Sequence, residues 1–159
     1  MLGPVAKWGL IAAAVVVLMP LLMLAVLSWT SRRPSTLGLA DGKLRRCPDS
    51  PNCVCSCDDT DGHSIAPLIW QGDAQEGLRR LTSVIATFPE ARCETSNRPD
   101  YLHAEFTSAW FRFVDDVEFL VDTAAGVIHV RSASRAGHSD LGVNRKRVER
   151  IRELFQASR

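Results

Sequence analysis

The sequence predicts an α+β protein in which a short antiparallel sheet of about four strands packs on two helices and is preceded by one transmembrane helix. Three patterns indicate this class: an uncharged apolar run near the N-terminus, several segments with period-two alternation, and two segments with helical periodicity. A chain of 159 residues, 46% hydrophobic and 23% charged, has room for one compact domain and an accessory segment. We divide it into an N-terminal tail (1–7), a transmembrane helix (8–31), a tether (32–46) and an α+β domain (47–159).

The N-terminal apolar run extends from Trp8 to Ser31 without a charged residue. At 1.5 Å per residue a helix of this length covers about 36 Å, which exceeds the roughly 30 Å hydrocarbon core of a bilayer. Trp8 and Trp29 lie near its ends, where indole rings favour the membrane interface, and a membrane helix tolerates Pro20. A cleaved signal peptide is the alternative, but the segment LAVLSWTS is a poor match to a small-residue cleavage site.

Two signals disagree about the side of the membrane. Lys7 precedes the span, whereas five basic residues follow it between positions 32 and 46, so the positive-inside rule keeps the domain in the cytoplasm. Five cysteines in so small a domain favour an oxidising compartment, although an odd number leaves one unpaired or all reduced. We expect a single-pass membrane protein, slightly favour export of the domain, and leave the side open.

Two segments have the periodicity of amphipathic helices. The first begins at Asp73, whose carboxylate caps the free amides while Glu76 completes a capping box, and it ends at Pro89. The second is the closing helix, for which we expect Asn144 to be the N-cap. The apolar stripes that cover the core side of the sheet are Leu78, Leu81, Ile85 and Phe88 in the first helix and Val148, Ile151, Leu154 and Phe155 in the second.

Between the helices lie four strand-like segments, at residues 91–95, 101–107, 114–122 and 127–133. If a four-residue turn joins the last two, alternation sets their register. The expected cross-strand pairs are Phe119 with Val130 and Val121 with Ile128 on the core side, and Glu118 with Arg131 and Leu120 with His129 on the other side. The segment 101–107 adds Leu102, Ala104 and Phe106 to the core side and Tyr101, His103 and Glu105 to the other, which we expect to be polar.

This polar face contains the candidate catalytic residues, which are His103, Glu105, Asp116, Glu118 and His129. Imidazole and carboxylate groups can act as general acid and base or hold a divalent metal, but Glu118 and Arg131 are more simply a cross-strand ion pair. The sequence lacks the phosphate-loop, nucleophile-elbow and zinc-protease signatures. We therefore assign no metal and no cofactor, and leave enzymatic activity undecided.

The stretch RSASRAGHSDLGVNRKR, residues 131–147, places basic side chains around the start of the closing helix. Positive charge there opposes the helix dipole by about 0.3 to 1 kcal/mol per charge, so we expect a negative partner. That partner is either an external phosphate, sulfate or carboxylate, or an internal carboxylate that locks the sheet to the helix. The residues of the external site are Arg131, Arg135, Asn144 and Arg145, and the candidate internal carboxylates are Asp115, Asp116 and Asp140.

The net charge of +1 is unevenly distributed: residues 58–122 contain 13 acidic and 5 basic side chains, and residues 131–159 contain 8 basic and 3 acidic ones. We expect these oppositely charged parts of the domain to face each other, which favours the internal carboxylate. A nucleic-acid-binding protein would leave its basic face unpaired and add stacking aromatics, so we expect no nucleic-acid partner.

Four separated segments, CPDSPNCV, HSIAPL, FVDDVEFL and RSASRAGHSDLGVNRKRVERIR, resemble the uncharacterised family of domain of unknown function 1499, from about Leu37 to the end. The resemblance implies no activity, substrate or cofactor. Its motif positions in this chain are Cys47, Asn52, Cys53, Asp115, Asp116, Arg131, Ser132, Ser134, Arg135, Gly137, Asp140, Gly142, Asn144 and Arg145. Cys55 and Cys57 depart from the family pattern, in which a serine or another small polar residue is expected after PNCV.

The cysteines allow three interpretations. In an exported domain we expect a disulfide between Cys47 and Cys53, because the two prolines between them favour a turn. Zinc is disfavoured, because Cys53, Cys55 and Cys57 are crowded into one run without a distant second pair of ligands. Reduced, buried thiols are the third interpretation.

We hypothesise a binding or assembly module tethered at the membrane surface. Its expected partners are the lipid bilayer, through the N-terminal helix, and a protein or a small anion. The alternative is a small enzyme, a hydrolase that uses the histidine and carboxylate face. Loss of His103 and His129 distinguishes the two, since an enzyme should require them and a module should not.

Overall fold

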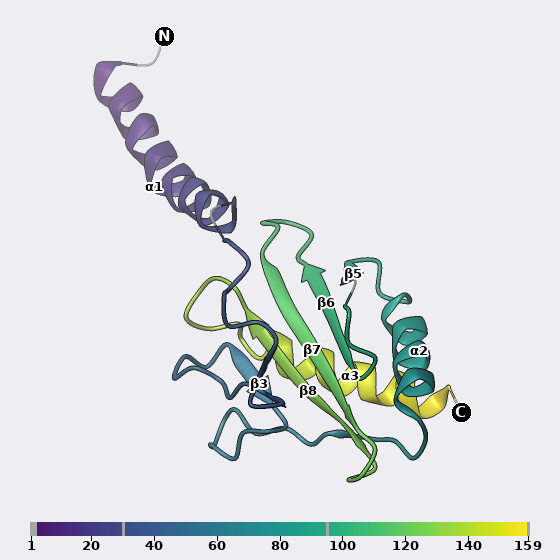
Figure 1. The fold of residues 1–159 in the computed structure, drawn as a ribbon. Coiled ribbons are helices and arrows are strands. Elements are labelled where there is room, and N and C mark those ends of the chain that lie inside the picture. Colours follow the sequence, from purple (N-terminus) through teal and green to yellow (C-terminus); the bar gives the residue numbers. More distant parts are fainter. Residues whose placement is uncertain (1–2, 30, 95, 159) are drawn as a thin grey trace.

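The computed structural model describes residues 3–29, 31–94 and 96–158, which form an N-terminal helix and an α+β domain (Figure 1). In chain order the elements are α1 (Pro4–Trp29), β1 (Leu39–Ala40), β2 (Lys43–Leu44), β3 (Cys53–Cys55), β4 (Leu68–Ile69), α2 (Ala74–Ile85), β5 (Ala91–Glu94), β6 (Tyr101–Thr107), β7 (Val114–Asp122), β8 (Val127–Ser134) and α3 (Val143–Ala157). The predicted class is confirmed, and β6 and β7 have the predicted boundaries.

In the described part of the chain the main sheet has six strands, not the four that the sequence predicts. Its antiparallel order is β3-β8-β7-β6-β5, and β4 also pairs with β8. The two additional strands are β3 and β4, which have three and two residues and are too short to show alternation. They pair with opposite ends of β8, whose eight residues accommodate both.

The predicted register of β7 and β8 is confirmed. The paired residues are Phe119 with Val130, Val121 with Ile128, Glu118 with Arg131 and Leu120 with His129. Strand β7 lies in the middle of the sheet and is buried on both faces from Asp115 to Val121. One of these faces is apolar and the other carries the polar residues considered below.

Helices α2 and α3 cover the apolar face of the sheet (Figure 1). The core between them contains Phe106, Phe119 and Phe155, which are among the largest fully buried side chains. Burial of such a side chain contributes about 1.5–3 kcal/mol, so this layer stabilises the domain.

Helix α2 begins as predicted: the Asp73 carboxylate accepts a hydrogen bond of 2.8 Å from the Glu76 amide. It ends at Ile85, earlier than the predicted stop at Pro89. The next amides turn back on the helix, with Thr87 donating to Val84 and the following residue donating to Ile85, both at 3.0 Å. This tightened last turn uses the final carbonyls before the proline is reached.

The polar face of the sheet is covered by the segment predicted to be a tether. Strands β1 and β2 form a small hairpin, and the Asp41-Gly42 turn has the positive φ angles, 51° and 77°, that a two-residue hairpin loop requires. Leu44 of this hairpin is buried against Cys55 and Leu120. Because of this cover, the polar residues beneath it are buried rather than exposed to solvent.

Helix α1 contains a candidate membrane span, Lys7–Ser28, whose most apolar 18 residues have a mean hydropathy of 3.0 and are not buried in the protein. In Figure 1 it extends away from the sheet and helices of the domain. A signal sequence near the N-terminus has the same length and composition, so the helix is compatible with an anchor and with a cleaved leader.

Candidate functional site

A pocket of about 300 Å³ lies between the tether, the Cys47–Cys53 loop and one end of the sheet. We call it the tether pocket, and its lining residues are Pro34, Thr36, Pro48, Ser50, Asn52, Asp116, Arg131, Ala133, Ser134, Arg135 and Gly137. Two of the four predicted anion-binding residues, Arg131 and Arg135, are among them. The tether pocket is therefore the candidate location of the predicted anion site.

Arg131 and Glu118 form the ion pair that the strand register predicts. Nη1 of Arg131 donates to Oε2 of Glu118 at 3.0 Å, and the side chains are 6% and 0% exposed. Oε1 accepts from the Tyr101 hydroxyl at 2.7 Å and from the Gly38 amide at 2.6 Å. Burial and the bond to Glu118 raise the pKa of Tyr101, so its hydroxyl stays a donor. The carboxylate thus has donors from the sheet and from the tether.

The other edge of the Arg131 guanidinium is free. Its Nε is buried without a hydrogen-bond partner, and Nη2 has none among the described residues. A buried donor without a partner costs about 1–3 kcal/mol and is rare in folded proteins. The Nε–Nη2 edge can hold a carboxylate or phosphate through two parallel hydrogen bonds. Because Arg131 lines the tether pocket, this edge is a candidate binding group.

Arg135 joins two other predicted residues. It donates to both oxygens of Asp116, from Nε at 2.8 Å and from Nη2 at 2.7 Å, and its Nη2 also contacts Glu105. Burial acts to raise the pKa of Asp116, but hydrogen bonds from Arg135 and His103 outweigh it and hold the pKa below its usual value. Asp116 is therefore a buried, ionised carboxylate, and for Arg135 the internal partner is the one present.

His103 is 2% exposed, and both its ring nitrogens have partners. Nε2 lies 2.8 Å from Oδ1 of Asp116, and Nδ1 lies 2.9 Å from Nη2 of Arg33. Because an arginine only donates, we assign the proton to Nε2 and the acceptor role to Nδ1. The ring is held between sheet and tether, with no nitrogen left for a substrate in this arrangement.

His103, Glu105 and Asp116 each place one ligand atom within 4.8 Å of the others, a spacing that could hold a metal ion. The Arg135 guanidinium already contacts both carboxylates. A cation would have to displace this positive charge or approach it closely, and either costs free energy. We therefore assign no metal to the cluster.

His129 lies apart from this cluster. It is on β8, and β7 separates it from His103 on β6, which corresponds to roughly 10 Å at the usual strand spacing. Its Nδ1 lies 3.2 Å from Oγ of Ser56, and its Nε2 lies 3.9 Å from Asp122. Of the five predicted catalytic residues, His103, Glu105 and Asp116 are thus together, Glu118 is paired with Arg131, and His129 lies farther along the same face of the sheet.

The predicted N-cap of the closing helix is wrong. Helix α3 begins at Val143, its N-cap is Gly142 with a φ of 79°, and Asn144 lies inside the first turn. The carboxylate of Asp140 takes the capping role, because it accepts from the Gly142 amide at 3.0 Å and from the Asn144 amide at 2.7 Å. The helix start therefore already has a negative partner, which is one of the internal carboxylates considered from the sequence.

Asn144 instead connects three parts of the domain. It is fully buried, and its Oδ1 accepts from the Ser132 hydroxyl at 2.6 Å. Its Nδ2 donates to the carbonyl of Asn52 and to Oγ of Ser134, both at 2.9 Å. Asn52 in turn donates to the Gly137 carbonyl at 2.7 Å. These bonds hold the wall of the tether pocket against α3, a role that sequence reasoning missed.

Two further basic residues of the α3 start are engaged within the domain, whereas Lys146 is exposed to solvent. Arg145 donates to the carbonyls of Gly62 and Ser64, both at 2.9 Å, and does not line the tether pocket. Arg147 donates to Oδ2 of Asp115 at 2.5 Å. The internal partners thus account for most of the basic stretch, and the free edge of Arg131 is the buried group of this stretch that remains.

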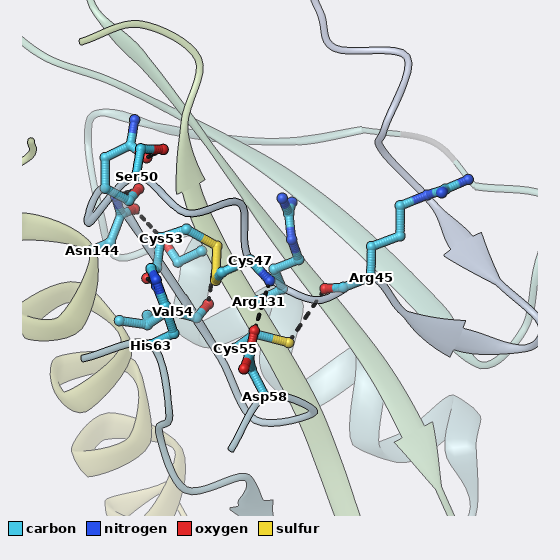
Figure 2. The surroundings of a disulfide bond; sticks show 12 residues. Arg45, Cys47, Ser50, Cys53, Val54, Cys55, Asp58, His63, Arg131 and Asn144 are labelled. Atoms are coloured by element: carbon cyan, nitrogen blue, oxygen red, sulfur yellow. Dashed lines mark hydrogen bonds between the residues drawn. A yellow bond between two sulfur atoms is a disulfide. The ribbon is translucent and has the colours of Figure 1, made fainter. Parts of the chain in front are cut away.

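The predicted disulfide between Cys47 and Cys53 is present, with the Cα atoms 5.6 Å apart (Figure 2). It closes the loop that carries Ser50 and Asn52 to the pocket. The Cys47 amide donates to Oδ2 of Asp58 at 2.9 Å, which fixes the start of the loop. The three remaining cysteines, Cys55, Cys57 and Cys93, are free.

A family model described as "Protein of unknown function (DUF1499)" matches residues 43–155, which include the disulfide loop, the whole sheet and nearly all of α3. No curated protein matches the chain. The match covers the residues of the tether pocket except those contributed by the first part of the tether.

Proposed function

The chain belongs to the DUF1499 family, which has no assigned function, and we propose from its site that it is a membrane-anchored binding module. We infer that its ligand carries a small oxyanion, a carboxylate or a phosphate group, which binds in the tether pocket. The observation that carries this proposal is the buried guanidinium of Arg131, whose Nε lacks a partner.

The charges in the pocket favour an oxyanion over a cation. Asp116 is already neutralised by Arg135, whereas Arg131 is paired with Glu118 through one edge only. A ligand oxyanion would complete the second edge with two charge-assisted hydrogen bonds. The Thr36 hydroxyl, which also lines the pocket, can donate to a remaining oxygen.

The tether places this pocket close to the proposed membrane anchor. Four residues, 29–32, separate Ser28 at the end of the candidate span from Arg33, which bonds to His103 on the sheet. An extended chain covers at most about 3.5 Å per residue, so Arg33 lies within about 18 Å of the end of the span. A ligand in the pocket would thus be bound near the membrane surface.

The hydrolase alternative stays a prediction. It requires a histidine or carboxylate that can exchange protons with a substrate. His103 and Asp116 are buried beneath the tether and bonded to Arg33 and Arg135, respectively. An enzyme would therefore need these bonds to be broken first, whereas an oxyanion at Arg131 would meet a donor that is not already bonded.

The test is a thermal melt of the full-length protein in detergent micelles, with millimolar acetate, succinate or inorganic phosphate at constant ionic strength. Bound ligand stabilises the folded state by RT ln(1 + [L]/Kd), so the melting temperature of the parent should rise with at least one anion. Arg131→Lys keeps a positive charge next to Glu118 but lacks the two-pronged edge, and should lose this rise.

Arg152→Lys is the matched control, because Nε of Arg152 is also buried without a partner but lies on α3, where Arg152 contacts the Ala66 carbonyl. It should keep the anion-dependent rise. Equal rises in the parent and in Arg131→Lys, or no rise with any of the three anions, would contradict the proposed site.

A further inference from the structure

A small hydrophobic cluster, separate from the main core, lies beneath the β1–β2 hairpin and contains three sulfur atoms. Cys55 and Leu120 are buried there with Leu44, and Cys47 and Cys57 pack against them. Cys47 is held in the disulfide, whereas Cys55 and Cys57 are free thiols. We propose that Cys55 and Cys57 form a redox-active dithiol that reduces a disulfide-bearing substrate. This activity is separate from the tether pocket and does not depend on an anion ligand.

The backbone brings the two sulfurs together. Cys55 is the last residue of β3, and the chain turns at Ser56 so that the Cys57 amide donates to Sγ of Cys55 at 3.3 Å. Figure 2 shows Sγ of Cys55 facing the Arg45 carbonyl, 3.5 Å away, on the inner side of the hairpin. Only Ser56 separates the two cysteines, so a disulfide between them would close across a single residue.

The two thiols have different environments. Cys55 is fully buried, whereas Cys57 is partly exposed and can meet a substrate. The hydrogen bond from Cys55, the charge of His129 and a bond from Ser56 lower the pKa of Cys57 to about 6, against the effect of burial. The bond with Cys57 and burial raise the pKa of Cys55, although Arg131 opposes this. Cys57 is thus the attacking thiolate at neutral pH, and Cys55 the protonated resolving thiol.

The polar and charged groups that act on the two thiols come from three strands, β2, β7 and β8. From β8, His129 lies near Cys57, and Arg131 acts on Cys55. His129 in turn faces Asp122, with Nε2 at 3.9 Å from the carboxylate. The backbone of Leu44, on β2, supplies a further hydrogen bond to Cys57. Most of these groups favour the thiolate on Cys57, which is the arrangement that a dithiol reductant requires.

Thiol–disulfide exchange at this pair takes place in two steps. The Cys57 thiolate attacks one sulfur of a disulfide RS–SR, forming a Cys57–S–S–R mixed disulfide and releasing RS⁻. Cys55 then gives its proton to that RS⁻, and its sulfur attacks Sγ of Cys57. The products are the Cys55–Cys57 disulfide, RSH and a second RS⁻. The dithiol loses two electrons, which reduce the substrate disulfide to two thiols.

Cys93 provides a matched control inside the same chain. It is a free, partly buried thiol on β5, and burial with the nearby charge of Glu94 raises its pKa. It has no second cysteine next to it in the described part of the chain. Any reactivity that is general to the thiols of this protein should therefore appear at Cys93 as well.

The first experiment needs no substitution. Full-length protein in micelles, with the Cys47–Cys53 disulfide intact, is labelled with iodoacetamide from pH 5 to 9, and each cysteine is quantified by peptide mass spectrometry. Labelling of Cys57 should have a midpoint near pH 6. At pH 5.5 it should be at least about tenfold faster than labelling of Cys93, because the larger thiolate fraction outweighs the lower nucleophilicity of a low-pKa thiolate.

The second experiment supplies the substrate. The same protein is incubated at pH 7 with oxidised glutathione or with a disulfide-linked peptide, quenched with acid and mapped. We expect a Cys55–Cys57 disulfide and release of two thiols, with the faster of the two substrates showing whether a small molecule or a peptide is preferred. In Cys55→Ser the reaction should stop at the mixed disulfide on Cys57, and Cys93→Ser should behave as the parent.

Two results would overturn the proposal. One is labelling of Cys57 that follows labelling of Cys93 at every pH, and the other is formation of mixed disulfides equally on Cys57 and Cys93.

Discussion

Glu118 on β7 and Arg131 on β8 lie directly opposite each other, and their ion pair of 3.0 Å is closed from solvent by the tether. The Gly38 amide completes the closure by donating to the same carboxylate at 2.6 Å. One buried carboxylate therefore connects the middle of the sheet, the tether and the arginine of the tether pocket. The segment next to the candidate span is part of the folded domain and not merely a linker.

Glu118→Gln should be strongly destabilising. The amide keeps the shape of the side chain but removes the charge, and so leaves the Arg131 guanidinium buried without a negatively charged partner. Loss of one member of a buried pair costs about 3–5 kcal/mol. Glu153→Gln is the control, because its pair with Arg150 is 66% and 60% exposed and should contribute under about 1 kcal/mol. Thermal melts of the full-length variants in micelles measure both, and similar melting temperatures would contradict the buried pair.

Arg135→Ala tests the internal partner of the basic stretch. It leaves the buried Asp116 carboxylate without its two hydrogen bonds, and should destabilise the protein by about 1–3 kcal/mol. Arg145→Ala removes bonds to two surface carbonyls, and should cost under about 1 kcal/mol because water can replace them. Melts without added anion compare the two, and an unchanged melt for Arg135→Ala would mean that Asp116 does not depend on Arg135.

The sheet could be predicted where side chains alternate. The register of β7 and β8 follows from Phe119 and Val121 on one side and Glu118 on the other, because a shift of one residue would exchange the faces. The strands β3 and β4 could not be predicted, since two or three residues contain no period. They are strands because β8 is long enough to pair with both of them, and this pairing forms only in the folded chain.

The candidate site could be predicted only in part. The Glu118–Arg131 pair follows from the register, but the closure by Gly38 involves a backbone amide, which leaves no signal in a side-chain pattern. The sequence predicts Asn144 as the cap because asparagine favours that position, but the helix begins one residue earlier and Asp140 accepts a hydrogen bond from the Asn144 amide itself. The free edge of Arg131 depends on where each guanidinium nitrogen points, which no sequence pattern specifies.

The full-length protein should fractionate with membranes and resist extraction by alkaline carbonate, because Lys7–Ser28 is long and apolar enough to cross a bilayer. Peptide mass spectrometry of the membrane fraction should recover residues from this segment. A shortened, soluble chain that lacks it would mean that the segment is a cleaved leader, and the module would then have no anchor. The anion and thiol experiments can be repeated on that chain, so their outcomes do not depend on this result.

Stability should fall on acidification, with Asp116 as one identifiable cause. Its pKa in the folded protein lies below its usual value, since the bonds from Arg135 and His103 outweigh burial, whereas in the unfolded chain it returns to about 3.9. The unfolded state therefore binds more protons between the two values. The contribution of Asp116 to stability is complete above about pH 4 and is lost as the pH falls through its pKa in the folded protein.

Asp116→Asn should lower stability at pH 7 and make the melting temperature less dependent on pH below 4. Asp59→Asn, at an exposed carboxylate, should leave the parent profile unchanged. Parallel profiles for the parent and Asp116→Asn would show that the carboxylate is not held ionised by Arg135.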